Sequence, residues 1–382
     1  MRDAEERFAG WRPEALRVPA EAAREALSAS SADFRSGLEG AAARIRDVHE
    51  AQLADERAAW WRVGDDDARV GEETRPLTRV GCYVPGGRAA YPSTVLMTAL
   101  AARVAGVDEV VVCVPGGADG VHPATLAACA VADVDEIYAI GGAQAIAALA
   151  YGTESLRRVD KIVGPGSIWV TLAKHEVAMD VGVDGFSGPT EVAIVADGSA
   201  QPSFVAADLI AQAEHDPLAT AILITDAERL IDEVERALPA EVERSPRRPD
   251  VEKALEAQGR AVLVRDLDQA LEIADAFAPE HLELVCEEAA SLLPRVRNAG
   301  AVFVGAYSPV AIGDYVAGTN HVLPTAGTAR FASPLRVADF FKSTAVVQFS
   351  RAGLERVSPW VRAMATTEGL DAHARAIEVR LS

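Results

Sequence analysis

The chain has 382 residues, of which 57 are acidic and 37 are basic, so its formal net charge is −20. This acidity, with no run of Lys or Arg, argues against nucleic acid as a partner. Hydrophobic residues make up 49% of the chain and charged residues 25%, as in soluble globular proteins, and no apolar run approaches the roughly 18 residues that span a bilayer. The charged start, residues 1–7, contains no apolar signal segment, so we expect a cytoplasmic protein without membrane partners.

The length predicts roughly two or three domains with a core that needs no covalent cross-links. The four cysteines lie far apart and form no C-x-x-C pair; they are Cys82, Cys113, Cys129 and Cys286. Three of them lie in apolar runs, which indicates reduced core residues rather than disulfides or thiolate ligands.

Residues 1 to about 75 are rich in Ala, Glu and Arg, with apolar residues at helical spacing. This pattern predicts an α-helical lead-in, with Pro13 and Pro19 in its first turns. We interpret Trp60 and Trp61 as packing residues rather than as a stacking platform.

From Thr78 onward, short β-branched runs alternate with Ala-rich helical segments, which predicts an α/β fold with parallel sheets and right-handed crossovers. The first series has strands at 78–84, 109–114, 136–140 and 161–163, and helices at 93–105, 123–131 and 143–150. The second has strands at 192–196, 221–225, 261–264 and 301–304, with an exposed loop at 245–250. After about residue 338 the pattern predicts only helices, ending in a short helix at 371–377.

Residues 208–217 predict a short helix that ends at Pro217 and carries two polar side chains in its last turn. Its i,i+3 spacing places Gln212 and His215 side by side. An amide oxygen and a neutral imidazole are suitable metal ligands, but they need further ligands from elsewhere in the chain. Taken alone, the helix favours the alternative of a solvated histidine at the negative end of a helix.

Glycines follow several of the predicted strands. In residues 140–144 and 164–167 the chain passes from a strand through glycine into a helix, which places backbone N–H groups where a diphosphate would bind. Neither stretch spells G-x-G-x-x-G, so the alternative that these glycines only turn the chain stays open.

Two further polar motifs interrupt apolar surroundings. Glu280 and His281 precede the apolar strand 282–285, where a carboxylate and an imidazole offer two bases; a histidine can take a proton from an alcohol near neutral pH. The alternative is two exposed polar residues at the start of a strand. In the loop 313–324, Asp314 and His321 could face one pocket.

Seven motifs, in this order, resemble those of the histidinol dehydrogenase family from about Thr78 to the chain end. They are 81–87, 141–154, 160–166, 188–191, 212–215, 279–283, and 313–315 with 318–325. The resemblance implies two incomplete Rossmann-like parallel-sheet domains, a helical N-terminal segment and a small helical C-terminal domain exchanged between subunits. The corresponding boundaries are 1–20 for the N-terminal segment, 21–82 with 190–335 for the first Rossmann-like domain, 83–189 for the second, NAD-binding one, and 336–382 for the tail.

The resemblance also implies a reaction: the zinc- and NAD-dependent oxidation of L-histidinol through L-histidinal to L-histidine, the last step of histidine biosynthesis. One Zn²⁺ per subunit would be held by Gln212, His215, Asp314 and the partner subunit's His373. The homodimer would therefore share its active sites between subunits.

In the same family pattern His281 is the base for the alcohol, and Glu280 activates the water that attacks the aldehyde. The substrate pocket would be lined by Thr190, Gln212, His215, His281, Asp314, His321, Glu368 and His373, and the NAD site by Tyr83, Gln144 and Ser167. Two features depart from the pattern. Ser167 stands where the family usually has Asn, and the N-terminal region is short.

Two other functions would share some of these motifs. A paralogue of the same fold could oxidise another small polar alcohol, such as a sulfonated diol. Glu368 and His373, which the resemblance assigns to the imidazole end of the substrate, favour histidinol. A non-catalytic metal- or nucleotide-binding regulator would not need the adjacent bases Glu280 and His281. The sequence leaves the native metal open among zinc, manganese and cobalt.

Overall fold

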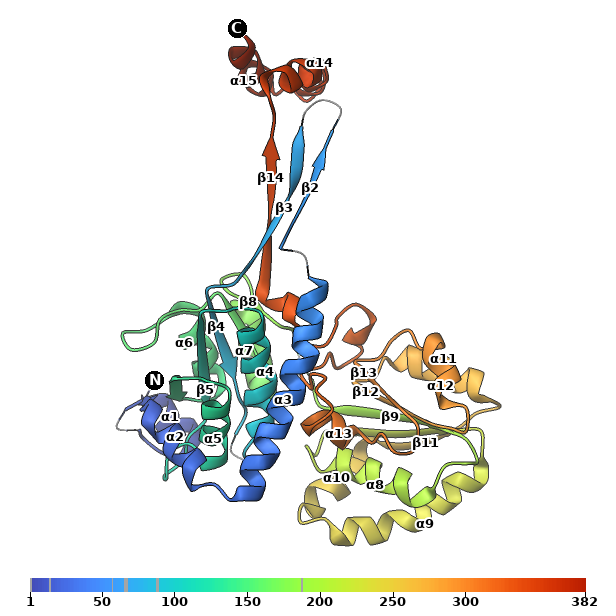
Figure 1. The fold of residues 1–382 in the computed structure, drawn as a ribbon. Coiled ribbons are helices and arrows are strands. Elements are labelled where there is room, and N and C mark those ends of the chain that lie inside the picture. Colours follow the sequence, from blue (N-terminus) through green and yellow to red (C-terminus); the bar gives the residue numbers. More distant parts are fainter. Residues whose placement is uncertain (1, 14, 57, 65–67, 87–88, 187) are drawn as a thin grey trace.

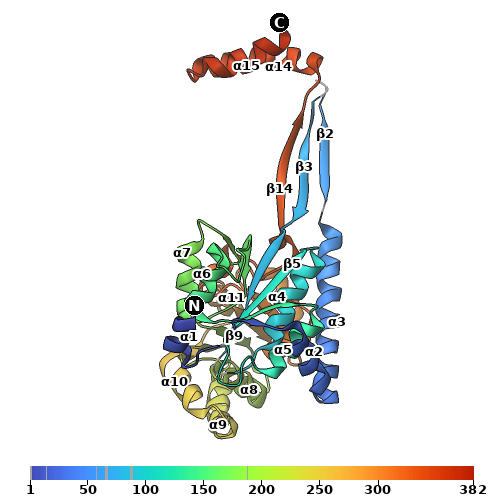
Figure 2. The ribbon, with the colours of Figure 1, turned by 90° about the vertical axis from the view of Figure 1, so that its left-hand side faces the viewer.

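The computed structural model describes residues 1–382 except 1, 14, 57, 65–67, 87–88 and 187. The body consists of two α/β halves, and a long three-stranded arm rises from it (Figure 1). The view turned by 90° shows the arm and its terminal helices standing clear of the body (Figure 2). Within the described part of the chain, no helix is long and apolar enough to cross a membrane.

The first half is a six-stranded sheet in the order β1-β6-β5-β4-β7-β8, parallel except for β1. Its strands are β1 (Arg17–Val18), β4 (Arg79–Tyr83), β5 (Glu109–Val114), β6 (Glu136–Ala139), β7 (Lys161–Val163) and β8 (Gly182–Val183). Its helices are α1 (Arg2–Ala9), α2 (Ala20–Ala29), α3 (Ala32–Asp55), α4 (Pro92–Val104), α5 (Pro123–Val131), α6 (Gly142–Tyr151) and α7 (Ile168–Val177).

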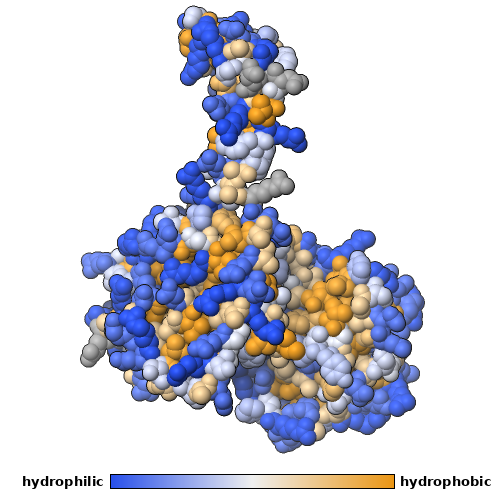
Figure 3. All heavy atoms as spheres, viewed as in Figure 1, coloured by the Kyte–Doolittle hydropathy of each residue, from blue (hydrophilic) through white to orange (hydrophobic). Residues whose placement is uncertain are grey.

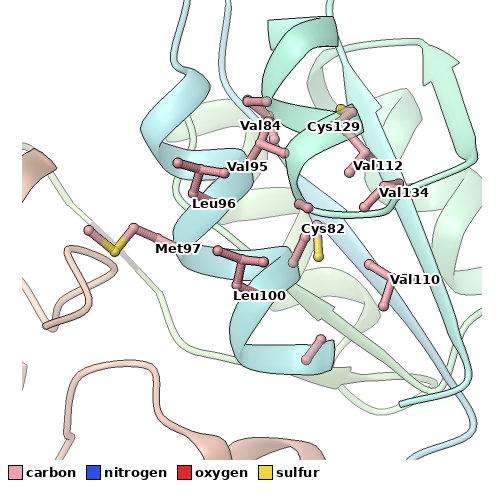
Figure 4. Close-up of a cluster of buried hydrophobic side chains, with 14 of the residues drawn as sticks. Cys82, Val84, Val95, Leu96, Met97, Leu100, Val110, Val112, Cys129 and Val134 are labelled. Carbon is pink, nitrogen blue, oxygen red and sulfur yellow. The ribbon is translucent and has the colours of Figure 1, made fainter. Parts of the chain in front are cut away.

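Helix α4 lies at the centre of this half. It contacts α3 and α5 as well as β4 and β5, which explains why it is apolar around most of its circumference. Figure 4 shows Val95, Leu96 and Leu100 of α4 beside Cys82 and Val112 of the sheet, all of them buried.

The second half is a five-stranded parallel sheet in the order β11-β10-β9-β12-β13. Its strands are β9 (Glu191–Ala196), β10 (Thr220–Thr225), β11 (Gly259–Leu263), β12 (His281–Val285) and β13 (Ala301–Val304). Its helices are α8 (Pro202–Ala213), α9 (Glu228–Arg244), α10 (Arg248–Gln258), α11 (Leu267–Phe277), α12 (Ala289–Leu292) and α13 (Val310–Tyr315). Residues of α8, α9 and α13 pack on one face of this sheet and those of α11 and α12 on the other.

The arm is an antiparallel sheet of β2 (Ala59–Val63), β3 (Arg69–Pro76) and β14 (Phe341–Gln348). Strand β14 pairs with β3 along its full eight residues and then continues into α14 (Arg351–Thr367) and α15 (Asp371–Leu381) at the far end. At about 3.4 Å per residue, the paired stretch spans roughly 27 Å. Three short 3₁₀ turns complete the chain: η1 (Leu293–Arg295), η2 (Thr328–Arg330) and η3 (Val337–Phe340).

The predicted α/β fold with parallel sheets is confirmed, but the arm was not predicted. Residues 59–63 and 69–76 form strands rather than helices, and 341–348 form a third strand where only helices were expected. Most of their residues are exposed or half-buried, so no alternation between a buried and a solvent face marks these strands in the sequence.

Three smaller expectations also have an outcome. Trp60 and Trp61 lie in β2, and neither is buried. Trp60 is exposed. The Arg69 guanidinium lies over the Trp61 ring, 4.1 Å from the ring centroid. The loop expected at 245–250 is shorter than predicted. Only residues 245–247 connect α9 to α10, because α10 begins at Arg248. All four cysteines are buried and free, as predicted. The domain boundaries stay a prediction.

Two glycine substitutions test the backbone of the first half. Gly164 has φ +110°, and an added Cβ would overlap the carbonyl oxygen of Tyr83; Gly40 lies in the exposed face of α3 with nothing within 4 Å. We expect Gly164→Ala to lower the free energy of unfolding by more than about 2 kcal/mol. The control Gly40→Ala should raise it by about 0.5 to 1 kcal/mol. Urea unfolding midpoints measure both, and equal stability of the two variants would contradict the close approach at Gly164.

Candidate active site

The polar motifs of the second half meet at the amino ends of two neighbouring strands. Glu191 begins β9, and His281, with Glu280 before it, begins β12, which pairs directly with β9. Helix α8 returns after β9 and ends near the same edge of the sheet, with Gln212 in its last turn. Glu280, His281 and Gln212 are all buried.

The hydroxyl of Thr190 connects two of these side chains. It donates a hydrogen bond to Glu280 Oε2 and accepts one from Gln212 Nε2 at 2.7 Å. The backbone N–H of Glu191 donates to the same Glu280 oxygen at 3.0 Å. With its Nε2 directed at Thr190, Gln212 leaves its Oε1 buried and without a hydrogen-bond donor. Such an atom is an acceptor placed to receive a ligand.

His215 follows Gln212 along the chain, and its ring lies close to Asp314. Helix α8 ends at Ala213, so the prediction that His215 belongs to its last turn is wrong; His215 lies in the turn that follows, where its Nδ1 donates to the Ala211 carbonyl oxygen at 3.0 Å. A carbonyl oxygen can only accept, so the lone pair of the neutral ring is on Nε2, 3.8 Å from Asp314 Oδ2.

The ring of His281, like that of His215, is oriented by a backbone carbonyl oxygen. Its Nδ1 donates to the Glu191 carbonyl oxygen at 3.0 Å and lies 3.6 Å from Glu280 Oε2. The neutral ring therefore presents the lone pair of Nε2, which can accept a proton.

His321 joins the two halves of the body. Its Nδ1 donates to the carbonyl oxygen of Asp314 at 3.1 Å, and its Nε2 lies 3.2 Å from the Thr94 hydroxyl in the first turn of α4. Burial lowers the pKa of His321. The nearby Asp314 opposes this shift, and the nearby His281 and His215 add to it. Asp314 and His321 therefore share one site, as the loop motif suggested, together with the two other histidines.

Glu191 was not among the predicted site residues. Its backbone contacts both Glu280 and His281, and its own carboxyl accepts from Ala326 N at 3.2 Å while the second oxygen is buried without a donor. Burial, with the charge of Glu280 as a second cause, raises the pKa of Glu191 to about 7. Its place in the motif 188–191 was the only sequence signal, because the carboxyl gains its neighbours through the fold.

The glycine turn after β6 forms a second polar region, at the carboxyl ends of the first sheet. The Tyr83 hydroxyl accepts from Gly142 N at 3.0 Å, and burial raises the pKa of Tyr83 to about 12. Gln144 Nε2 and Gly141 N both donate to Glu5 Oε1, at 2.7 and 3.1 Å. The structure thus brings Tyr83 and Gln144 to one turn, and it adds the buried Glu5, which the sequence did not single out.

Of the remaining predicted residues, Ser167 follows β7 at the carboxyl edge of the first sheet, whereas Glu368 and His373 lie apart from both regions. Ser167 is the exposed N-cap of α7, and its side chain makes no capping hydrogen bond. Glu368 caps the C-terminus of α14, and His373 lies in α15; both are exposed at the tip of the arm. The paired arm separates them from Gln212 and Asp314 of the same chain (Figures 1 and 2).

The ligand set that the resemblance implies fits this geometry in part. The chain brings together an unpaired amide oxygen, an imidazole lone pair and a carboxylate. The separation of His215 Nε2 from Asp314 Oδ2 is near the roughly 3.4 Å expected for two ligands of one tetrahedral ion. Within the described residues, no group of three or more His, Cys, Asp or Glu side chains gathers around one point.

Comparisons with known proteins identify the family. The sequence model of the family described as histidinol dehydrogenase matches residues 1–381. The chain belongs to the histidinol dehydrogenase family. It is 48% identical to the histidinol dehydrogenase of Parasynechococcus marenigrum (strain WH8102), covering 100% of this chain and 86% of the relative. It is 50% identical to that of Moorella thermoacetica, covering 96% and 86% respectively.

A solved structure supports the same conclusion. The crystal structure of histidinol dehydrogenase from Elizabethkingia anophelis matches with a TM-score of 0.92 at 32% identity, covering 100% of this chain and 87% of that one. The predicted resemblance, the oxidoreductase class and the assignment as a histidinol dehydrogenase are confirmed. The roles of the individual residues stay predictions.

The Thr190 hydroxyl gives a direct test of the hydrogen-bond network in this histidinol dehydrogenase. Thr190→Val keeps the side-chain shape but leaves Gln212 Nε2 without its acceptor and removes one donor from Glu280. We expect dehydrogenase activity to fall roughly 10- to 100-fold. Thr190→Ser retains the hydroxyl and should stay within a few-fold of the wild type. Equal losses in both variants would contradict the role given to the hydroxyl, because only Thr190→Ser retains it.

Proposed function

We propose that the chain oxidises L-histidinol through L-histidinal to L-histidine, using NAD and one zinc ion per subunit, as a homodimer in the cytoplasm. The observation that carries the proposal is the pairing of a ligand group, Gln212, His215 and Asp314, with the adjacent bases Glu280 and His281. The family membership gives the reaction, and the geometry suggests which residues perform it.

Gln212 Oε1, His215 Nε2, Asp314 and the partner subunit's His373 would hold the metal ion. A bound Zn²⁺ would act as a Lewis acid that orients the amino and imidazole nitrogens of the substrate. The Thr190 hydroxyl keeps the Gln212 amide oxygen free for this purpose by taking the amide nitrogen as its donor. The Ala211 carbonyl oxygen does the same for His215, since it accepts the Nδ1 proton.

The two bases serve the two oxidations. In the first, His281 Nε2 accepts the hydroxyl proton of the alcohol while hydride passes to NAD. In the second, Glu280 would take a proton from water, whose oxygen adds to the aldehyde carbon, and the hydride of the resulting hydrate would pass to a second NAD. Glu280 is held for this role by Thr190 and by the N–H of Glu191. Thr190 and His321, with the partner subunit's Glu368 and His373, would complete the substrate pocket.

NAD would bind near Tyr83, Gln144 and Ser167 at the carboxyl ends of the first sheet, the usual location for a dinucleotide in such sheets. Glu5 accepts hydrogen bonds from Gly141 N and Gln144 Nε2, so a phosphate at this turn would compete with the Glu5 carboxylate for the same two donors.

A second copy of the chain would supply Glu368 and His373. The arm holds these residues away from the body of their own chain, and α14 presents Trp360 and Met364 to solvent with 69% and 64% of their surface exposed. These two residues are four apart and so share one face of the helix. Figure 3 shows apolar residues among polar ones on the protruding arm and tip. Such a face suits a contact with a partner subunit.

The stoichiometry of NADH formation tests the reaction. With L-histidinol and excess NAD, about two NADH should form per substrate consumed; activity should be lost with a chelator and restored by zinc. Glu280→Gln should slow the oxidation of histidinal far more than that of histidinol, because only the second step needs activated water. No NADH from histidinol, with zinc bound, would contradict the proposed substrate.

Mixing two inactive variants tests the shared site. His281→Asn and His373→Ala should each be inactive as homodimers. A heterodimer has one doubly altered site and one intact site, which combines His281 of one subunit with the partner's His373. After equal mixing and subunit exchange, statistical pairing gives about one quarter of wild-type activity. No recovery, although heterodimers form, would mean that each subunit uses its own tail.

A further inference from the structure

Two carboxyl groups meet beneath the proposed metal site, and neither has a role in the proposed reaction. Asp208 lies in α8 and Glu283 in β12, and their side chains are hydrogen-bonding neighbours. Glu283 is buried. Its Oε1 accepts from Val310 N at 2.9 Å, whereas Oε2 is buried without an N–H or hydroxyl donor. Two carboxylates cannot hydrogen-bond to each other unless one of them carries a proton.

The pair joins the three elements that carry the proposed site. Asp208 is one helical turn before Gln212 in α8, and Glu283 is two residues after His281 on the same face of β12. Val310, which donates to Glu283, is one turn before Asp314 in α13. The carboxyl pair thus fixes α8 and α13 against β12 through one continuous set of contacts.

Close packing beside the pair keeps α13 in place. Glu283 has Ile194 of β9 and Phe303 of β13 as its cross-strand neighbours. An added Cβ at Gly313 would lie only 2.7 Å from the Phe303 ring, so α13 sits directly on that ring. Because the neighbours of Glu283 within the sheet are apolar, water is excluded and an uncompensated charge there is costly.

The pKa values of both carboxyls are raised, as expected if the pair retains a proton. Burial, with the charge of Asp208 as the next cause, raises the pKa of Glu283 to about 8, and burial raises the pKa of Asp208 to about 6. The groups that act on Glu283 are the Asp208 carboxyl from α8 and the Val310 N–H from α13, and the strands on either side contribute Ile194 and Phe303. No basic side chain among the described residues acts on either carboxyl.

We propose that Asp208 and Glu283 share one proton and act as positioning residues, holding Gln212, His281 and Asp314 in the arrangement that binds the metal and the substrate. This inference rests on the proposed function for the identity of the metal. The proton sharing itself does not depend on the metal, because it follows from a buried carboxyl with one unpaired oxygen, a half-buried neighbouring carboxyl and a single N–H donor.

Two substitutions at Glu283 separate positioning from stability. In Glu283→Gln the amide oxygen can accept from Val310 N and the amide nitrogen can donate to Asp208, so the link is kept without a shared proton. Glu283→Leu fills the space but leaves Val310 N and Asp208 unpaired. Val285→Ala is the matched control, because it removes buried volume from the same face of β12 without touching the pair.

Zinc affinity, measured by competition with a chromogenic chelator on the full-length dimer, is the first measurement. We expect Glu283→Leu to bind zinc roughly 10- to 100-fold more weakly, and Glu283→Gln and Val285→Ala to stay within about threefold of the wild type. If Glu283→Leu binds zinc as the wild type does, the positioning role is overturned. If the wild type itself binds no zinc, it is the proposed function that fails.

The pH dependence of stability of the metal-free protein is the second measurement. A carboxyl whose pKa is raised in the folded state stabilises the fold below its ordinary pKa of about 4.3, and this contribution is lost as the pH rises towards about 8. Between pH 5 and 8, the unfolding constant of the wild type should rise relative to that of Glu283→Gln by up to tenfold per pH unit. Glu191 titrates in both proteins and cancels in the ratio. Parallel pH profiles would overturn the proton sharing.

Discussion

The hydrogen bonds of the Thr190 hydroxyl are the interaction on which the site depends. One oxygen accepts from the Gln212 amide and donates to Glu280, so the orientation of the proposed metal ligand and the position of the proposed base are set together. Because the amide nitrogen is used, the amide oxygen is left buried and unpaired, a state that costs free energy unless a ligand arrives. A bound cation would satisfy this oxygen.

The two candidate regions lie at opposite ends of the strands in the two sheets. The proposed bases lie at the amino ends of β9 and β12, while the glycine turn with Tyr83 and Gln144 lies at the carboxyl ends of the first sheet. The loop 318–325 bridges the halves. His321 lies against Thr94, and Asn320 donates to the carbonyl oxygen of Met97, both in α4. In the proposed arrangement, with NAD on one half and the substrate on the other, these contacts would help to set the position of one half against the other.

Much of the body could be predicted from sequence, because buried parallel strands appear as short apolar runs between Ala-rich helices. β5, β7 and β13 match the predicted limits, since each is bounded by Asp, Gly or Pro. The arm could not be predicted, because β3 is mostly polar and depends on its pairing with β2 and with β14, which follows it by about 270 residues. The carboxyls of Glu5, Glu191 and Glu283 were missed for a related reason: only tertiary packing gives them their partners.

In the proposed homodimer, the arm would let a chain with a net charge of −20 pair with its own copy. Charges separated by more than about 8 Å are largely screened at physiological ionic strength, so the general repulsion acts weakly on a contact made at the tip. Covering a Trp side chain of roughly 150 to 250 Å², at about 25 cal/mol per Å², favours the contact by about 4 to 6 kcal/mol before the entropy of association is subtracted. Trp360 and Met364 thus offer apolar surface on one exposed face of α14 that a docked partner would cover. A site completed through such a contact ties each proposed metal centre to assembly, because an isolated chain keeps its Glu368 and His373 at the end of its own arm.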